Sequence, residues 1–252
     1  MNKNKIDKEL LKQFKERDSF SREELYNFYR CYDPEINPQT LSWRLYDLKR
    51  KNFIQEIRRG MYTVSQKMNY KPFVNERMKE IFKTVSELFD EVKIVIWSTS
   101  WINNFSLHQT FHNYIILEAA SDVTESLFFK MKEMQIANVF LKPDQELLSK
   151  YAFGEQESVI IKNLITKSPI QKLEGINFPT LKKILVDLFS DEKTFYSYQG
   201  HELKEIFRNA IQRYPINYTK LFHYARRRGK EIEVQNYLTT NFRHELEGIL
   251  ND

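Results

Sequence analysis

The residues best suited to chemistry in this sequence lie between positions 37 and 64. One face of a predicted helix there carries side chains with planar or long polar ends, namely Gln39, Trp43, Tyr46 and Arg50. Two further cations, Arg58 and Arg59, follow at a tight turn. Glutamine and arginine can make bidentate hydrogen bonds to adenine and guanine edges, and cations bind phosphates. The chemistry indicated is non-covalent recognition of duplex DNA.

The local pattern predicts a helix and a two-stranded hairpin that would position these side chains. Asn37 is a suitable N-cap because its side-chain oxygen can accept a free N–H, and Pro38 suits the first helical position. The opposite side of the helix carries an apolar stripe, formed by Leu41, Leu45 and Leu48. The chain then alternates through residues 53–57, turns at 58–60 and returns through 61–64.

Two more helices are predicted before this segment. The first has an apolar face formed by Ile6, Leu10, Leu11 and Phe14. The second opens on a capping box, Ser21 with Glu24, and ends before Pro34, because proline disfavours a helical residue in front of it. Three helices and a basic hairpin predict a winged helix-turn-helix over residues 1–66, with the third helix as the recognition helix.

Charge is concentrated in this predicted domain. Residues 1–64 contain 14 Lys and Arg against 10 Asp and Glu, a net +4, and the rest contain 25 against 24, a net +1. A basic surface gains affinity for DNA by releasing counterions from phosphates. The side chains that we expect to contact DNA are Gln39, Thr40, Ser42, Trp43, Tyr46, Arg50, Arg58, Arg59 and Tyr62.

The remainder predicts an α/β domain over residues 73–252, so the fold class expected is α/β (α+β overall). Helical periodicity at 74–89 is followed by alternating strand and helix signals, with a short helix at 100–107 and another from Asp122 to Met134. The predicted strands, in a parallel or mixed sheet, are 92–97, 114–118, 139–141 and 159–161. After Pro179 the chain becomes helical, at 180–189, 201–213, 218–228 and 231–237.

Composition excludes several classes of protein. No stretch approaches the roughly 20 apolar residues that cross a bilayer, and the first residues contain no apolar signal segment. Cys31 is the single cysteine, so a disulfide framework and a cysteine-rich zinc site are excluded. Its side chain is expected to be buried, and a reducing cytoplasm is the expected location. Glycine occurs only 6 times, and no phosphate-binding glycine motif is present.

A search for catalytic groups finds one suspicious carboxylate. Glu118 ends an apolar strand, where α/β enzymes often place functional groups, whereas Asp122 suits a helix cap. A metal nuclease would need a carboxylate and lysine on the adjoining strand, and the next strand along the chain offers only Lys142. His108 and His112 are four residues apart but lead into a strand. We therefore expect no enzyme, no cofactor and no metal.

A second basic cluster follows near the C-terminus. It consists of Arg226, Arg227, Arg228 and Lys230. Consecutive residues fan out around a helix, and cations are favoured at a helix C-terminus by its dipole. The cluster is therefore either a solvated helix end or a second patch for phosphates or an acidic partner.

Several segments together resemble a known family. They are R-R-G-x-Y at 58–62, WSTSWINNFSLHQ at 97–109, TLKKILVDL at 180–188, and YPINYTKLFHYARRR at 214–228. This combination resembles the AbiEi-type antitoxins, transcriptional regulators of abortive-infection, type IV toxin–antitoxin systems. The resemblance implies a bacterial autorepressor whose winged helix binds operator repeats. It also implies a C-terminal domain that contributes to DNA binding and counters a nucleotidyltransferase toxin. Only the wing and the recognition helix can be carried over residue by residue.

Three functional hypotheses follow from the sequence. The leading one is a non-enzymatic DNA-binding repressor, an antitoxin if a toxin accompanies it. The alternative is a nucleic-acid-processing enzyme, a nuclease or a nucleotidyltransferase-like protein, which a winged helix would target and in which Glu118 would act. The third is a protein-interaction module, since winged helices also bind proteins.

Overall fold

The protein is described by a computed structural model. It describes residues 3–17, 19–64, 69–110, 113–136, 138–151, 157–243 and 246. The chain divides into two compact units. Unit 1 comprises Met1–Asn69, Ile211–Thr219 and Leu238–Asp252, and unit 2 comprises Tyr70–Ala210 and Lys220–Tyr237. C-terminal segments thus belong to the same unit as the N-terminal helices.

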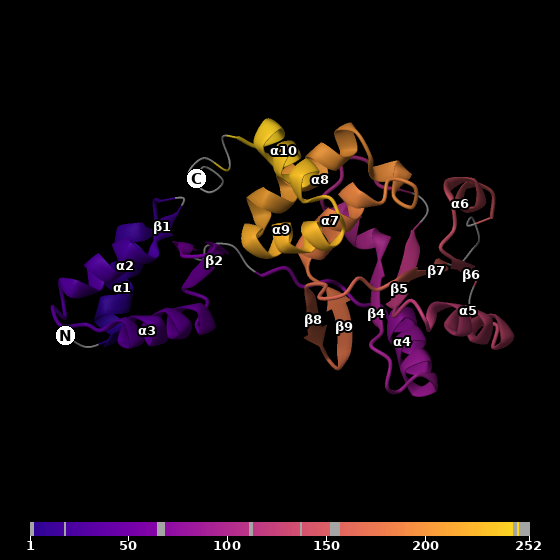
Figure 1. The fold of residues 1–252 in the computed structure, drawn as a ribbon, viewed down its shortest axis with the longest axis horizontal. Helices are drawn as coiled ribbons and strands as arrows, with labels where there is room; N and C mark the ends of the chain where they lie inside the picture. The colour runs from indigo at the N-terminus through magenta and orange to yellow at the C-terminus, as the bar shows by residue number, and fades with distance from the viewer. Residues whose placement is uncertain are drawn as a thin grey trace. The chain divides into compact units, whose positions relative to one another are not determined.

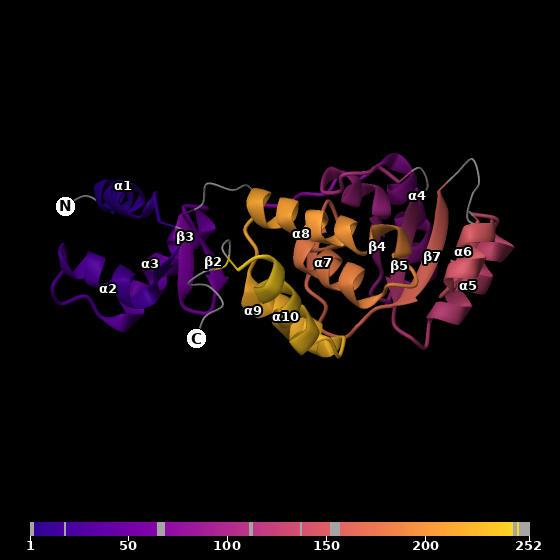
Figure 2. The ribbon, with the colours of Figure 1, turned by 90° about the horizontal axis from the view of Figure 1, so that it is seen from above.

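Unit 1 has the element order of a winged helix-turn-helix. Its helices are α1 (Lys3–Phe14), α2 (Arg22–Arg30) and α3 (Pro38–Arg50). Its strands are β1 (Phe20–Ser21), β2 (Ile54–Arg58) and β3 (Met61–Val64), which form an antiparallel sheet in the order β1-β3-β2. The wing is the β2–β3 hairpin (Figures 1 and 2). The predicted fold is confirmed, with the two-residue β1 as an addition.

Short polar side chains define where the helices of unit 1 begin. The Asn37 side chain accepts the Thr40 backbone N–H at 2.7 Å, and Pro38 occupies the first turn of α3. The Ser21 hydroxyl accepts the Glu24 N–H, and the Glu24 carboxylate accepts the Ser21 N–H in return. Both predicted caps are therefore confirmed, and each satisfies backbone donors that a helix start leaves open.

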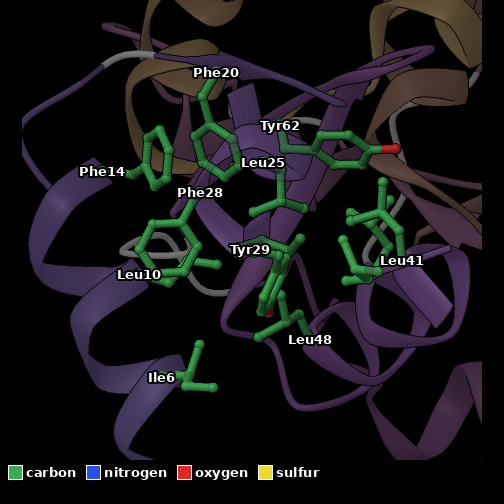
Figure 3. Close-up of a cluster of buried hydrophobic side chains, with 13 residues drawn as sticks. Ile6, Leu10, Phe14, Phe20, Leu25, Phe28, Tyr29, Leu41, Leu48 and Tyr62 are labelled. Atoms are coloured by element: carbon green, nitrogen blue, oxygen red, sulfur yellow. The ribbon is translucent and has the colours of Figure 1, made fainter. Parts of the chain in front are cut away.

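The core of unit 1 fixes which face of α3 points outward. Figure 3 shows apolar side chains from the three helices and the sheet pointing toward one another. The leucine stripe of α3 lies in this core, with at most 4% of any of its side chains exposed. Burying one such side chain stabilises a fold by about 1.5–3 kcal/mol. Because this stripe is held inside, the opposite face of α3 must be outside.

The environment of Cys31 differs from the prediction. Its side chain is exposed, and the residue is the C-cap of α2, with Sγ 3.4 Å from the Asn27 carbonyl oxygen. The buried residues of α2 are Leu25, Phe28 and Tyr29, and Cys31 follows the last turn of the helix. The chain leaves the core at residue 31, so small size alone does not bury this side chain.

Unit 2 is built on a four-stranded mixed sheet in the order β4-β5-β7-β6. The strands are β4 (Val95–Ser98), β5 (Tyr114–Ala119), β6 (Val139–Leu141) and β7 (Ser158–Asn163). β4 pairs antiparallel with β5, whereas β5–β7 and β6–β7 are parallel. The predicted mixed sheet is confirmed. A separate hairpin, β8 (Ile170–Leu173) with β9 (Ile176–Pro179), was not predicted.

The α-helices described between residues 76 and 241 are α4 (Glu76–Leu88), α5 (Thr124–Glu133), α6 (Gln145–Tyr151), α7 (Leu181–Ser190), α8 (His201–Arg213), α9 (Tyr218–Arg227) and α10 (Glu231–Asn241). Figure 1 shows α7 and α8 on the side of the sheet opposite to α4 and α5. No helix in the described part of the chain combines the length and apolar character needed to span a membrane.

Two local predictions in unit 2 are corrected. The N-cap of α5 is Val123, and no side chain makes a cap hydrogen bond there, so Asp122 does not cap this helix. The predicted helix at 100–107 is instead a 3₁₀ helix at Thr99–Asn104, which the Ser98 side chain caps through the Ser100 N–H.

Candidate nucleic-acid interface

The outer face of α3 exposes two large aromatic side chains. Trp43 is 57% exposed and Tyr46 is 62% exposed, and Gln39 and Arg50 on the same helix are also exposed. The other two tryptophans, Trp97 and Trp101, are at most 4% exposed. Neighbouring exposed aromatic rings are typical of a surface that binds a partner. The structure therefore brings together the four side chains that helical spacing predicted.

Arg50 is oriented by a buried carboxylate. Its guanidinium lies 2.8 Å from the Asp47 carboxylate, which is 3% exposed and also lies 3.0 Å from the Lys51 ammonium. The Arg50 side chain is 66% exposed. Arg50 contacts Asp47 through Nη2, so other N–H groups of the guanidinium can serve a base edge or a phosphate while Asp47 holds the side chain.

Three other residues of the predicted set have structural roles. Thr40 donates its backbone N–H to the α3 cap. The Ser42 hydroxyl donates to the Pro38 carbonyl at 2.8 Å and accepts from the Arg22 guanidinium at 2.8 Å, so its single donor is in use. Tyr62 is 4% exposed, and its ring packs in the core while its oxygen points away from the cluster (Figure 3). We therefore assign Tyr62 to packing.

The wing places the remaining two arginines. Its turn needs the positive φ of Gly60, +76°, which glycine adopts without strain. The β2–β3 register shifts between Glu56 and Arg58, and such a bulge re-aims the side chains beside it. The Arg59 side chain is exposed, whereas Arg58 is half-buried. Within unit 1 the Asn217 amide donates to the Glu56 carbonyl at 2.8 Å, which anchors the wing backbone.

Sequence reasoning missed two cations beside this surface. Arg22, at the start of α2, and Lys49, on α3, line a groove together with Ser42 and Arg59. Lys49 lies seven residues after Ser42, so helical spacing could have placed the two on one face. Arg22 depends on the tertiary approach of α2 to α3, which no local pattern contains.

The predicted second basic patch is largely paired with neighbouring acids. Arg226 holds Glu231 through two contacts of 2.6 and 2.8 Å, and Lys230 lies 3.1 Å from a Glu233 oxygen. Arg228 lies 3.5 Å from Asp187. Three of the four cations are thus engaged within unit 2. The arrangement is that of a stabilised helix end, and we do not carry this patch into the interface.

Glu118 lies in a buried network of charges in unit 2. Its Oε1 is 2.7 Å from the Lys183 ammonium and accepts the Trp97 indole N–H at 3.3 Å. Lys183 also lies 2.6 Å from Asp187, which accepts the Tyr224 hydroxyl at 2.8 Å. Burial raises the pKa of Glu118, and Asp187 raises it further, against Lys183. The carboxylate is therefore a partner of an internal lysine.

The strand next to Glu118 is not the one expected. β7 rather than β6 adjoins β5, so Lys162 lies opposite Glu118 in register and Lys142 does not. Lys162 contacts Asp191 and lies 2.9 Å from the Thr194 hydroxyl. The cavity beside these groups has room for about one water molecule. Acids and bases balance there, which is typical of a structural charge network.

The two histidines considered as ligands are not brought into a described site. His108 Nδ1 lies 3.1 Å from the Glu202 carboxylate, which also accepts the Leu107 and His108 backbone N–H groups. His112 lies outside the described residues. Among the residues that the structure describes, no three His, Cys, Asp or Glu side chains are grouped so as to hold a metal ion.

Two partly buried lysines of unit 2 predict an unusual dependence of stability on pH. Burial lowers the pKa of Lys162 to about 8 and that of Lys182 to about 8, whereas a lysine in the unfolded chain has a pKa of 10.5. Between these values the unfolded chain binds more protons than the folded chain. The free energy of unfolding should therefore rise with pH from about 8 to 10, by at most about 1.4 kcal/mol per pH unit for each lysine.

Urea denaturation at several pH values within this window measures that dependence. Burial raises the pKa of Tyr237 to about 12, above the 10 of a tyrosine in the unfolded chain, so tyrosine ionisation opposes the rise from about pH 10 upward. The Lys162→Met variant should show a shallower rise, because one of the two lysines no longer titrates. A free energy of unfolding that is flat or falls across the window would contradict the prediction.

The fold and this surface define a class of protein: an N-terminal winged helix-turn-helix, a mixed-sheet α/β unit and C-terminal helices. The chain belongs to a family of unknown function (DUF6577), whose sequence model matches residues 40–244, most of the 252 residues. The match begins inside α3 and runs through α10. A comparison with curated proteins finds none that matches the chain.

Proposed function

We propose that the chain is a non-enzymatic, DNA-binding transcriptional repressor that reads duplex DNA with α3 and the wing. One observation carries this proposal: Trp43 and Tyr46 are exposed on the face of α3 opposite to its buried leucines. The net charge of +4 on residues 1–64 supports it, since phosphates attract such a unit. The winged helix-turn-helix order of the elements supports it as well.

The proposed contacts follow from the chemistry of each side chain. The major groove is about 12 Å wide and admits a helix. Gln39 and Arg50 lie on the exposed face and have the groups for bidentate contacts to adenine and guanine edges. Trp43 and Tyr46 offer rings to thymine methyl groups and sugars, and Tyr46 adds a hydroxyl. Arg59 would reach a phosphate or the minor groove from the wing.

Tryptophan fluorescence tests this proposal directly. Trp43 is the one exposed tryptophan of three, because Trp97 and Trp101 are buried. Binding of a duplex to α3 should therefore protect Trp43 from quenching by acrylamide and leave the other two unchanged. In the Trp43→Phe variant the quenching should be low with and without DNA. Full quenching of Trp43 in a saturated complex would contradict contact through α3.

A salt titration separates phosphate contact from other kinds of binding. The logarithm of the association constant should fall linearly with the logarithm of the salt concentration, by about 0.9 for each phosphate neutralised. A slope near zero would remove the electrostatic basis of the proposal. It would favour the protein-interaction hypothesis instead, in which the exposed aromatic rings form a contact with another protein.

The finer proposal is that the chain is an antitoxin that represses its own promoter. Support comes from the resemblance of the segments at 58–62, 97–109, 180–188 and 214–228 to AbiEi-type antitoxins of type IV toxin–antitoxin systems. The partners would then be operator repeats and a nucleotidyltransferase toxin. A neighbouring gene for such a toxin, whose growth inhibition this chain relieves on co-expression, would support the assignment. A neighbour without that activity leaves a plain repressor.

A further inference from the structure

A groove beside the recognition helix concentrates cations from three elements of unit 1. It has a volume of about 550 Å³ and lies between the start of α2, the side of α3 that carries Ser42, Leu45 and Lys49, and the wing. Arg22, Lys49 and Arg59 line it, together with one carboxylate, Glu56. The groove therefore has a net charge of +2. Charge of this sign in a concave surface favours an anionic occupant.

Hydrogen bonds hold the elements of the groove in place. The Arg22 backbone N–H donates to the Gly60 carbonyl at 2.8 Å, which ties the start of α2 to the wing turn. The Arg22 guanidinium donates to the Ser42 hydroxyl at 2.8 Å, and Ser42 in turn donates to the Pro38 carbonyl. Arg22 is thus directed across the groove, and its remaining N–H groups can serve a second acceptor.

Lys49 has an internal anionic partner in the same groove. Its ammonium lies 3.4 Å from the Glu56 carboxylate and 5.9 Å from the centre of the Tyr62 ring. The side chains of Lys49 and Glu56 are 38% and 29% exposed, so water screens this pair. A phosphodiester of the DNA backbone carries one negative charge on two non-bridging oxygens, as a carboxylate does. Because water already weakens the Lys49–Glu56 pair, such a phosphate can replace Glu56 as the partner of Lys49.

We propose that this groove is a phosphate-binding site for the DNA backbone, in which Arg22 contacts the phosphate. Ser42 is a positioning residue that holds Arg22 by a hydrogen bond. Glu56 forms an ion pair with Lys49 in the absence of DNA, and the phosphate takes its place in the complex. The inference rests on the proposed DNA-binding function and adds to it residues of α2 and the wing that lie outside the base-reading face. Phosphate contacts fix the register of a protein on a duplex, so the groove would set how α3 enters the major groove.

The test is the salt dependence of binding of the full chain to a mixed-sequence duplex. The slope is that of the logarithm of the association constant against the logarithm of the salt concentration. Arg22→Ala should make this slope less negative by about 0.9, the value for one phosphate contact. Arg22→Lys keeps the charge and should retain the wild-type slope. Lys12→Ala, which removes an exposed cation of α1, is the charge-matched control and should leave the slope unchanged. A wild-type slope in Arg22→Ala would overturn the proposal.

Two further variants test the roles of Ser42 and Glu56. Ser42→Ala should weaken binding less than Arg22→Ala and keep the wild-type slope, because Arg22 is still charged but no longer held. Glu56→Gln should strengthen binding to any duplex, because Lys49 is released. Its control is Glu23→Gln, which changes the net charge equally at an exposed position outside the groove lining and should have a smaller effect.

The outcomes distinguish this inference from the proposed function. A wild-type chain without a steep negative slope overturns the proposed function and the phosphate site together. A steep wild-type slope that Arg22→Ala leaves unchanged overturns the phosphate site alone. Equal effects of Glu56→Gln and Glu23→Gln would show that only net charge matters, and would also overturn the site. Melting temperatures equal to that of the wild type confirm that each variant is folded.

Discussion

Replacing Lys183 with methionine is expected to lower the free energy of unfolding by about 3–5 kcal/mol, the cost of breaking a buried ion pair by removing one partner. Lys183 is 1% exposed and lies within 2.7 Å of both Glu118 and Asp187. Burial alone would lower its pKa, but these two carboxylates raise the pKa above its ordinary value. Methionine fills a similar volume, so the expected loss is electrostatic. The midpoint of urea denaturation measures it.

A compensating variant separates charge from packing. Lys183→Met combined with Glu118→Gln removes one cation and one anion and leaves Asp187 with Arg228 and the Tyr224 hydroxyl. This double variant should recover most of the lost stability, because no buried carboxylate is left without a partner. Lys172→Met, at an exposed position of β8, is the control and should change stability by less than about 0.5 kcal/mol. If Lys183→Met matched this control, the network would not be a stabilising element of unit 2.

This network also explains why the role of Glu118 was hard to assign from sequence. A carboxylate near the end of an apolar strand has the same local pattern whether it serves chemistry or pairs with an internal lysine. Lys183 lies 65 residues away on α7, and a lysine on a helix usually points to solvent. Glu118 and Lys183 meet because α7 packs against the end of β5. The residue spacing within either segment cannot predict this tertiary contact.

Local signals, in contrast, predicted unit 1 well. The caps at Asn37 and Ser21 and the leucine stripe of α3 depend on neighbours within one or two helical turns. Short-range hydrogen bonds and helical periodicity therefore fixed the helix starts and the buried face. The exposure of Trp43 and Tyr46 followed from geometry, since the opposite face was already committed to the core.

The order of strands could not be predicted in the same way. β6 follows β5 along the chain, but β7 inserts between them in the sheet. This places Lys162 opposite Glu118, where sequence order had suggested Lys142. Consecutive strands are neighbours in only about two-thirds of cases, and a crossover that skips a position has no local signature. Arg22 was missed for the same reason, because its partner Ser42 is on another helix.

Replacing Arg50 and replacing Arg59 with alanine are expected to change DNA binding in different ways. Arg50→Ala should weaken binding to a preferred duplex by about 1–3 kcal/mol and remove the preference at one base pair, as the loss of a bidentate base contact does. Arg59→Ala should weaken binding to all duplexes about equally and reduce the salt slope by about 0.9. The preferred duplex is the one that the wild-type chain selects from a randomised pool.

The reason for the difference lies in how each side chain is held. Asp47, itself 3% exposed, directs the Arg50 guanidinium from within the recognition helix, so its placement is repeatable enough to discriminate between bases. Arg59 is an exposed residue of the wing turn and has no comparable carboxylate partner among the described contacts. Lys12→Ala on α1 serves as the control for net charge. Small and equal effects of Arg50→Ala and Arg59→Ala would mean that this face of α3 does not enter the groove, and the assignment of the recognition helix would fail with it.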